Sequence, residues 1–276
     1  MSNTAVQLRP WQLYHNCHTN IGTVGKIPKI IHQTWKDNVI PENWIMSPVN
    51  WKRLHGDWLW LLWTDDDIRE YIRTFHPDYV SLFNEFKYGI QMADAIRYFI
   101  LYDFGGIYSD LDVVPKKNLA EYFTSNLPLY LVMSPNLNYF SNFFMVSAPR
   151  QPLWRYVWKA MTEELPSWVV GKHMEVMYST GPAMFNKQVM EYNQIVGFLP
   201  RKVFAPVSVM DDPEKIDTEE SAIIMLPGQS WCQVDSQVYN FFLRHRVKFI
   251  ALSGVLSVLF VLIMIRKMLK RKSTSK

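Results

Sequence analysis

The stretch over residues 91–112 constrains the fold more than any other part of the chain. It begins as an almost entirely apolar segment whose polar members, Gln91, Asp94 and Arg97, recur at a spacing of three and therefore share one face of a helix. The pair Gly105-Gly106 ends that helix, because glycine readily takes the left-handed backbone conformation. The next residues read as a short strand. The sequence therefore predicts a buried helix that turns back directly into a strand.

Two carboxylates stand where this short strand ends. Asp110 and Asp112 are two residues apart, and such close carboxylates repel each other unless a cation lies between them. Divalent cations such as Mg²⁺ prefer oxygen ligands, although an Asp-x-Asp pattern alone is common in turns. The double-glycine turn brings the chain back from Asp94 and Arg97, so we expect the two pairs to be neighbours in space. A buried Asp–Arg pair that only fixes the helix and a polar ligand site fit this pattern equally well.

Strand and helix signals alternate along the first half of the chain. Residues 29–33, after Pro28, are typical of a first buried strand, and residues 58–63 are a continuous apolar run short enough for a buried parallel strand. Thr64 and Asp67 form a capping box that predicts a helix to about Phe75. Later segments are less regular; we expect strands near 129–133 and 143–146 and helices over about 153–164 and 182–192. The pattern predicts an α/β domain with a mostly parallel sheet flanked by helices.

The composition excludes several classes of protein. Apolar residues make up 49% of the 276 residues and charged residues 20%, which excludes a disordered chain. Of the 29 Lys and Arg residues, six lie in residues 266–276, and the rest of the chain is close to neutral, which argues against a body that binds nucleic acid. The two cysteines, Cys17 and Cys232, exclude a disulfide framework and a zinc site built on thiolates.

A run without charge lies near the C-terminal end. Residues 249–265 are flanked on both sides by basic residues and predict one short transmembrane helix of the secretory pathway, with the Golgi favoured. The basic tail favours a cytosolic tail and a lumenal body, whereas the first twenty residues contain no apolar run of the signal-peptide type. We expect the lumenal arrangement. The predicted organisation is an N-terminal segment over 1–26, one domain over 27–245, the span over 249–265 and a basic tail over 266–276.

Several segments occur in the order that is typical of a known family. They are residues 27–35 (IPKIIHQTW), 93–98 (ADAIRY), 102–112 (YDFGGIYSDLD), 180–182 (TGP) and 227–231 (PGQSW). Together they resemble the sugar-binding region, with its DXD motif, of family 32 glycosyltransferases. They are most similar to the group that contains the inositol phosphoceramide mannosyltransferases and the initiating α-1,6-mannosyltransferase. The resemblance implies a GT-A-like, Rossmann-type fold and a retaining hexosyltransferase.

The resemblance also implies roles for the polar residues described above. Asp112 would ligate a Mn²⁺ or Mg²⁺ ion that bridges the diphosphate of a nucleotide-sugar. Asp110 would reach the metal through water or hold the ribose and the sugar. Asp94 and Arg97 would bind hydroxyl groups of the donor sugar. These four residues are the expected catalytic set.

Further residues would complete the donor site. Tyr108 would lie beside the donor, and the segment from His32 to Trp35, expected as a loop after the first strand, would receive the nucleotide. Ser230 and Trp231 would close over the diphosphate, with Ser230 also near the metal. Cys232 stands where the mannosyltransferase branch usually carries histidine, which is a departure from the pattern.

The function expected from these features is a membrane-anchored, metal-dependent transfer of a hexose, with mannose from GDP-mannose favoured, to a glycolipid such as inositol phosphoceramide. A glycoprotein glycan is the alternative acceptor. A second alternative is a non-catalytic, membrane-anchored partner subunit of a glycosyltransferase complex. A third is a phosphatase of the haloacid dehalogenase type, since residues 110–114 match its nucleophile motif and Asp211-Asp212 offers a later metal pair.

Overall fold

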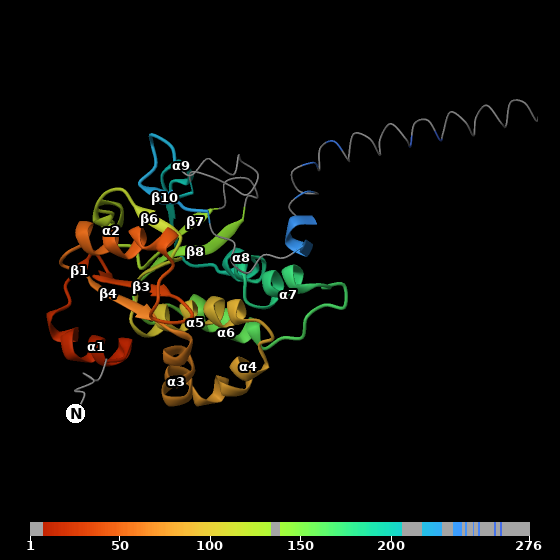
Figure 1. The fold of residues 1–276 in the computed structure, drawn as a ribbon, viewed down its shortest axis with the longest axis horizontal. Helices are drawn as coiled ribbons and strands as arrows, with labels where there is room; N and C mark the ends of the chain where they lie inside the picture. The colour runs from red at the N-terminus through yellow and green to blue at the C-terminus, as the bar shows by residue number, and fades with distance from the viewer. Residues whose placement is uncertain are drawn as a thin grey trace, which may run out of the picture. The chain divides into compact units, whose positions relative to one another are not determined.

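A six-stranded sheet lies at the centre of the structure, a computed structural model that describes residues 8–133, 139–205, 217–227, 234–238 and five single residues beyond them (Figure 1). The strands follow the order β4-β3-β5-β8-β7-β9. Their bounds are β3 Ile30–Thr34, β4 Leu59–Trp63, β5 Gly106–Ser109, β7 Leu129–Met133, β8 Phe140–Ser147 and β9 Gly197–Leu199. Only β8 runs against its neighbours in this sheet, which confirms the prediction of a mostly parallel sheet in an α/β domain.

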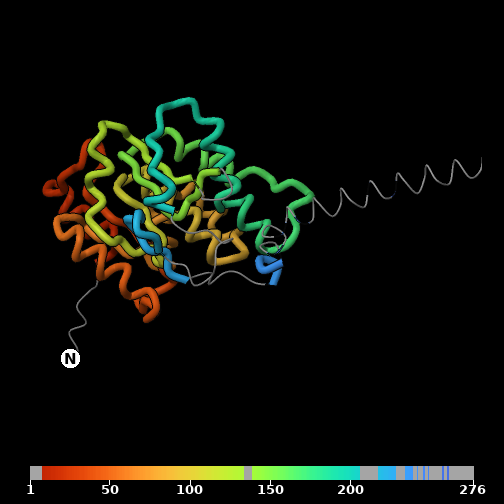
Figure 2. Tube along the Cα trace, turned by 90° about the horizontal axis from the view of Figure 1, so that it is seen from above, coloured from red at the N-terminus to blue at the C-terminus, as the bar shows by residue number. Residues whose placement is uncertain are grey.

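Helices and two small sheets surround the central sheet. The helices are α1 Pro10–Cys17, α2 Met46–Leu54, α3 Asp65–Phe75, α4 Val80–Glu85, α5 Gly89–Asp103, α6 Pro152–Met161, α7 Lys172–Ser179, α8 Pro182–Glu191 and α9 Arg201–Phe204. The small sheets pair β1 Thr23–Val24 with β2 Ile27–Pro28, and β6 Val113–Pro115 with β10 Ile223–Met225. In Figure 1, α2 and β6 lie on one side of the central sheet, and α3, α4 and α6 on the other. Seen from above in Figure 2, the segment with α7 and α8 lies at the opposite end from the N-terminal helices.

Two apolar cores result, one on each face of the sheet. Neighbouring residues of a strand point to opposite faces, and accordingly Ile30 belongs to one core and Ile31 to the other. The first core packs α3, α5, α6 and α8 onto the sheet, and the second packs α2, α9 and the strands β6 and β10. Helix α5 has buried residues around most of its circumference, which explains its nearly uniform apolar sequence.

The local predictions around α5 are confirmed. The chain leaves the helix through Gly105 and Gly106, which have φ angles of 65° and 94°, and enters β5 at once. A Cβ atom on Gly106 would lie 2.5 Å from the carbonyl oxygen of Ile30, so β5 approaches β3 more closely than any side chain would allow. The capping box of Thr64 and Asp67 is also present at the start of α3.

One expectation about the first strand was wrong. His32 is not part of a loop; it lies in β3, which continues to Thr34, and only Trp35 extends beyond it. The His32 ring is completely buried, with Nε2 2.9 Å from the Gly105 carbonyl oxygen and Nδ1 accepting a hydrogen bond from Trp63. These two contacts satisfy both ring nitrogens inside the core. His32 therefore joins the first strand to the double-glycine turn.

The C-terminal part forms a separate unit. Residues 1–231 make up the first unit, which contains all the strands above, and residues 232–276 the second. The predicted span over 249–265 lies outside the described residues, apart from Ser257 and Phe260. Within the part of the chain that the structure describes, no helix combines the length and the hydropathy needed to cross a bilayer.

Candidate functional site

A cavity of about 570 Å³ opens where the parallel strands end. Its walls include residues that follow β3, β4 and β5, because the carboxyl ends of parallel strands meet at one edge of a sheet. The cavity is lined by five of the residues predicted for the site: Trp35, Asp94, Arg97, Asp110 and Asp112. The sheet edge thus gathers residues that are far apart in the sequence; the Gln33 side chain, for example, donates a hydrogen bond to the Asp110 carbonyl 77 positions away.

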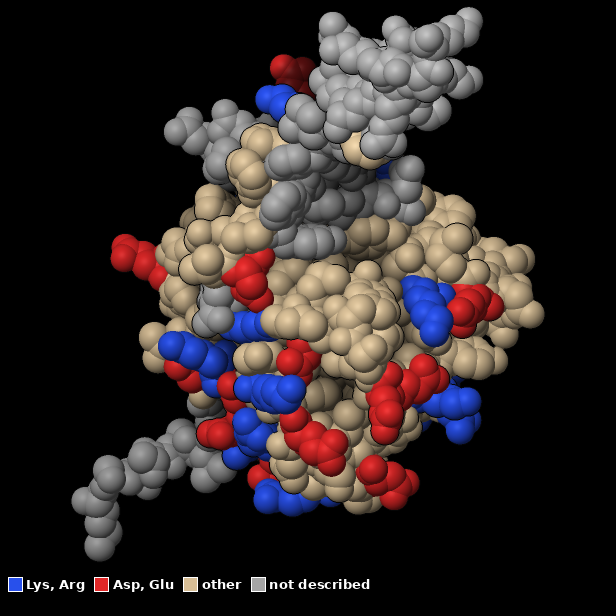
Figure 3. All heavy atoms as spheres, turned by 90° about the vertical axis from the view of Figure 1, so that its right-hand side faces the viewer, with Lys and Arg blue, Asp and Glu red and all other residues tan. Residues whose placement is uncertain are grey.

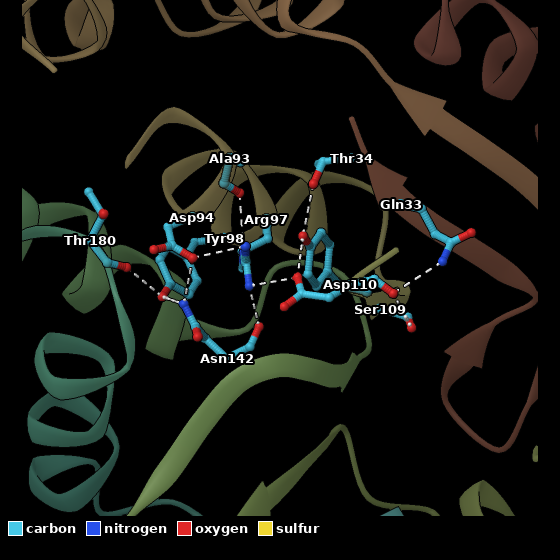
Figure 4. A network of polar contacts seen from close by, with 11 residues as sticks. Gln33, Thr34, Ala93, Asp94, Arg97, Tyr98, Ser109, Asp110, Asn142 and Thr180 are labelled. Carbon is cyan, nitrogen blue, oxygen red and sulfur yellow. Dashed lines mark hydrogen bonds and ion pairs between the residues drawn. The ribbon is translucent and has the colours of Figure 1, made fainter. Parts of the chain in front are cut away.

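The buried guanidinium of Arg97 lies at the centre of a network of polar contacts at the floor of the cavity (Figure 4). Arg97 lies 2.8 Å from Asp94 and 3.1 Å from Asp110. It also donates hydrogen bonds to the backbone carbonyl oxygens of Ala93 and Asn142. One cation therefore joins helix α5, the turn after β5 and strand β8. The expectation that the Asp94–Arg97 pair and the Asp-x-Asp turn are neighbours in space is confirmed.

Tyr108 lies beneath this network and is fully buried. The Arg97 guanidinium is 4.4 Å from the centre of its ring, a cation–π distance. Its hydroxyl donates a hydrogen bond to Asp110 at 2.9 Å and lies 3.0 Å from the Thr34 hydroxyl. Tyr108 is absent from the residues that line the cavity, so its contact with the open space passes through Asp110 and Arg97.

Asn142 of strand β8 is a second side chain that binds Asp94. Its amide group donates to the Asp94 carboxylate at 3.0 Å and to the Tyr98 hydroxyl at 2.9 Å. The Tyr98 hydroxyl in turn donates to the backbone carbonyl of Thr180, just before α8. Asp94 is thereby held from both sides, by a guanidinium and by an amide. Sequence analysis missed Asn142; a single amide inside the aromatic run of residues 139–144 was the available signal.

The turn that carries the two aspartates is fixed by its backbone. The Val113 amide donates to the Asp110 carbonyl, which closes the turn between β5 and β6. The buried Gln33 amide donates to the same carbonyl and to Ser47, whose hydroxyl donates to the Val113 carbonyl. The Asp112 carbonyl accepts from Leu226, next to β10. These hydrogen bonds therefore fix the backbone positions of both aspartates without a ligand.

The electrostatics of the turn favour a positive ligand. Burial raises the pKa of Asp112 to about 8, and the neighbouring Asp110 carboxylate adds to the rise. Burial raises the pKa of Asp94 to about 7, with Arg97 acting in the opposite direction. Burial likewise raises the pKa of Asp110, against the effect of Arg97. Three carboxylates share one guanidinium, so ionisation of all three would leave an excess of negative charge, which a bound cation would offset.

The residues of the turn fit a divalent cation. The side chain of Asp110 is 32% exposed, and its contacts with Arg97 and Tyr108 all fall on Oδ1. Among the described residues, no side chain binds the Asp112 carboxylate, and no group of three or more His, Cys, Asp or Glu residues converges on one point. The chain thus offers two carboxylates and leaves other coordination positions to water and phosphate, which is how Mg²⁺ and similar ions are commonly held.

The remaining predicted site residues are placed as follows. Trp35 is half-buried at the cavity wall and packs edge to face with Trp44, with 4.9 Å between ring centres. Ser230 and Trp231 lie outside the described residues. Two further charged residues, Lys36 and Asp65, line the cavity without having been assigned to the site.

Comparisons with known proteins agree with this site. Residues 41–129 match the family described as "Glycosyltransferase sugar-binding region containing DXD motif". Inositol phosphoceramide mannosyltransferase 3 of Schizosaccharomyces pombe is 40% identical over 159 residues, which cover 56% of this chain and 43% of that protein. Mannosyl phosphorylinositol ceramide synthase CSH1 of Saccharomyces cerevisiae is 37% identical over 168 residues, which cover 61% of this chain and 44% of that protein.

A third relative matches over a longer range. Inositol phosphoceramide mannosyltransferase 1 of Schizosaccharomyces pombe is 29% identical over 247 residues, which cover 87% of this chain and 74% of that protein. The alignments with the first two relatives span less than half of their lengths. Among solved structures, "PaToxG Glycosyltransferase" superposes with a TM-score of 0.43 and 16% identity over 59% of this chain and 69% of that one.

The DXD turn at the carboxyl edge of the sheet and the sequence matches make this chain similar to enzymes of the glycosyltransferase class. The matches confirm the resemblance, predicted from the sequence motifs, to glycosyltransferases whose sugar-binding region contains a DXD motif. They favour this resemblance over the phosphatase alternative. A DXD region of this kind is generally associated with a divalent metal ion, in agreement with the free carboxylate oxygens of the turn.

Proposed function

We propose that this chain is a metal-dependent, retaining glycosyltransferase of the GT-A type that transfers mannose from GDP-mannose to inositol phosphoceramide. The observation that carries the proposal is the convergence of Asp94, Arg97, Asp110 and Asp112 on one cavity at the carboxyl edge of the sheet. The names of the relatives, which refer to mannosyl transfer and inositol phosphoceramide, support the choice of sugar and acceptor.

The residues of the cavity would have different roles, according to their positions. Asp94 and Arg97 would bind and orient hydroxyl groups of the mannose, because both are held rigidly and face the cavity. Asp112, with Asp110, would hold Mn²⁺ or Mg²⁺. A cation bound there would offset the negative charge that develops on the diphosphate as it leaves. Arg97 would meanwhile keep the Asp110 carboxylate in place and ionised.

An uncharged surface supports a lipid acceptor. Helix α7 contributes Val176 to the cavity wall, and the loop before it exposes Trp168 and Val170, with 57% and 75% of their surfaces accessible. Figure 3 looks onto the side that carries α7 in Figure 1 and shows an area of uncharged residues between groups of charged ones. Tryptophan and aliphatic residues are suited to contact with the interfacial region of a bilayer.

We also propose a single membrane anchor over residues 249–265, with the body in the lumen of the Golgi. The support is the uncharged run and the basic residues that follow it. Extraction of the full chain from membranes with alkaline carbonate, and protease protection of an epitope at either end, test this arrangement. Release into the carbonate supernatant would contradict the anchor, and digestion of the body in sealed vesicles would contradict the lumenal orientation.

The activity is tested with the full chain in detergent, Mn²⁺, GDP-mannose and inositol phosphoceramide, with a mannosylated glycoprotein glycan as a second acceptor. Transfer to the lipid should be lost in Asp112→Ala and kept in Asp78→Ala, which removes an exposed carboxylate away from the cavity. Full activity of Asp112→Ala would contradict the metal-binding role. A folded wild-type chain that transfers nothing would favour a non-catalytic partner subunit.

A further inference from the structure

The strand order sets the direction in which a nucleotide-sugar lies in the cavity. The lining residues follow one another along the sheet edge as Asp65 after β4, Trp35 and Lys36 after β3, Asp110 to Asp112 after β5, and Asn142 in β8. Asp94 and Arg97, the proposed sugar-binding pair, contact the β8 side. With the diphosphate at the central Asp110–Asp112 turn, the nucleoside must extend toward β3 and β4.

Asp65 stands at the far end of this row. Strands lie about 4.8 Å apart, so the end of β4 is about 10 Å from the end of β5, with β3 between them. The Asp65 amide donates to the Lys36 carbonyl at 3.3 Å, so the pairing of β3 and β4 continues up to this residue. That distance places the ribose nearer β5, where the contacts of Asp110 with Arg97 and Tyr108 leave its Oδ2 atom unused, and the base nearer Asp65.

The Asp65 carboxylate lies in the first turn of α3, where an acidic side chain is favoured, but it does not form the helix cap. Asp67, and not Asp65, forms the capping box with Thr64. Asp65 is half-buried at the cavity wall, and no hydrogen bond or ion pair joins its carboxylate to another described residue. Burial raises its pKa, against the effect of Arg69. An acidic side chain in a cavity for a diphosphate requires a partner that presents N–H or O–H donors.

The hydrogen-bonding groups of the four bases indicate which base Asp65 would bind. A carboxylate binds best to two parallel donors. Guanine carries two adjacent donors, N1–H and the 2-amino group, on one edge, whereas the single N3–H of uracil is flanked by two carbonyl oxygens that repel a carboxylate. Adenine and cytosine each place one amino group beside a ring nitrogen that is an acceptor. Trp35, half-buried beside Asp65, offers a ring for stacking with any base.

We propose that Asp65 determines the nucleotide specificity of the donor site by accepting hydrogen bonds from N1–H and the 2-amino group of guanine, while Trp35 stacks on the base. This inference rests on the proposed function, since it takes the cavity as a nucleotide-sugar site. It assigns the residue that would select GDP-mannose over sugars carried by UDP. Asp65 is a specificity-determining residue here and takes no part in bond breaking.

The experiment measures dissociation constants of four nucleoside diphosphates by calorimetry, with the full chain in detergent and Mn²⁺. The ligands are GDP, IDP, which lacks the 2-amino group, XDP, which has a carbonyl in its place, and UDP. For the wild type, loss of one hydrogen bond to a charged group should weaken IDP about tenfold relative to GDP. Asp65→Asn should reverse the preference to XDP over GDP, because an amide accepts from N1–H and donates to the new carbonyl.

The neighbouring Asp66→Asn is the matched control, because Asp66 is exposed and does not line the cavity; its preferences should equal those of the wild type. An unchanged ratio of GDP to XDP affinity in Asp65→Asn would overturn the inference. Equal weakening of all four ligands would also overturn it, since that pattern indicates a contact with the ribose. Lipid mannosylation by the wild type, measured in parallel, separates failure of this inference from failure of the proposed function.

Discussion

Arg97 lies 3.1 Å from Asp110, so an ion pair joins the middle of helix α5 to the first residue of the turn after strand β5. The same guanidinium lies 2.8 Å from Asp94 on its own helix. This geometry fits both interpretations of the Asp94–Arg97 face that the sequence left open. The pair fixes the helix, and it also faces the cavity in which Asp110 and Asp112 lie.

We expect Arg97→Ala to lower the free energy of unfolding by about 3–5 kcal/mol, because it leaves the buried carboxylate of Asp94 without its cation. Urea denaturation of the metal-free chain measures this change. The control is Arg73→Ala, whose ion pair with Glu70 is exposed and should contribute less than about 1 kcal/mol. Similar losses in the two variants would show that Arg97 does not hold the floor of the cavity.

The pH dependence of stability should report on Asp112. Its pKa is about 8 in the folded chain against an ordinary value of 3.8, so the folded state binds more protons than the unfolded state between these values. The free energy of unfolding of the metal-free protein should therefore fall as the pH rises from about 5 to about 8. Asp112→Asn should make this profile flatter, although Asp94 still contributes to the slope.

Added Mn²⁺ provides the second half of that test. A cation competes with the proton on Asp112, so the ion should raise the unfolding temperature of the wild type more at high pH than at low pH. The Asp112→Asn variant should show little response to the ion at either pH. A wild-type profile that rises with pH, or an equal response of the variant to Mn²⁺, would contradict the assignment of Asp112 as a ligand.

Tyr108→Phe should show whether the Tyr108 hydroxyl positions Asp110 for metal binding. The variant keeps the ring under Arg97 but removes the hydroxyl that donates to Asp110, at a cost of about 1–2 kcal/mol in stability. Since that hydrogen bond lowers the pKa of Asp110, its loss should also weaken Mn²⁺ binding, measured by titration of the ion in the transfer assay.

A second buried tyrosine gives the matched comparison. Tyr71→Phe removes a hydroxyl that donates to Asp103, which does not line the cavity. It should cost similar stability and leave the Mn²⁺ dependence unchanged. Equal Mn²⁺ dependence in both variants would mean that the Tyr108 hydroxyl contributes to stability alone.

Local rules predicted the parts of the fold that local interactions determine. The capping box of Thr64 and Asp67 and the double-glycine turn each depend on residues within a few positions, and both are present as expected. The spacing of Asp94 and Arg97 placed them on one helix face for the same reason. The short turn then predicted that Asp110 lies close to them, and this prediction did not require the strand order.

The features that sequence analysis missed depend on contacts between distant segments. Asn142 reaches Asp94 only because β8 pairs antiparallel with β5, a register that no nearby residue reveals. Asp65 lies at the acidic start of a helix, so nothing in the local sequence indicated that it lines a cavity. Its place in the cavity wall follows from the pairing of β4 with β3. The end of the first strand depends likewise on distant contacts, because the buried partners of the His32 ring are Gly105 and Trp63.

The close approach between the backbones of β5 and β3 yields the last prediction. Gly106 has a φ of 94°, and an added Cβ would lie 2.5 Å from the Ile30 carbonyl oxygen. Gly106→Ala should therefore separate β5 from β3 and move the Asp110–Asp112 turn. We expect a loss of more than about 2 kcal/mol in the free energy of unfolding, measured by urea denaturation, together with loss of transfer. The control is Gly89→Ala in the first turn of α5, where an added Cβ meets no atom within 4 Å and alanine favours the helix. A Gly106→Ala variant as stable as Gly89→Ala would show that β5 and β3 do not require this close approach.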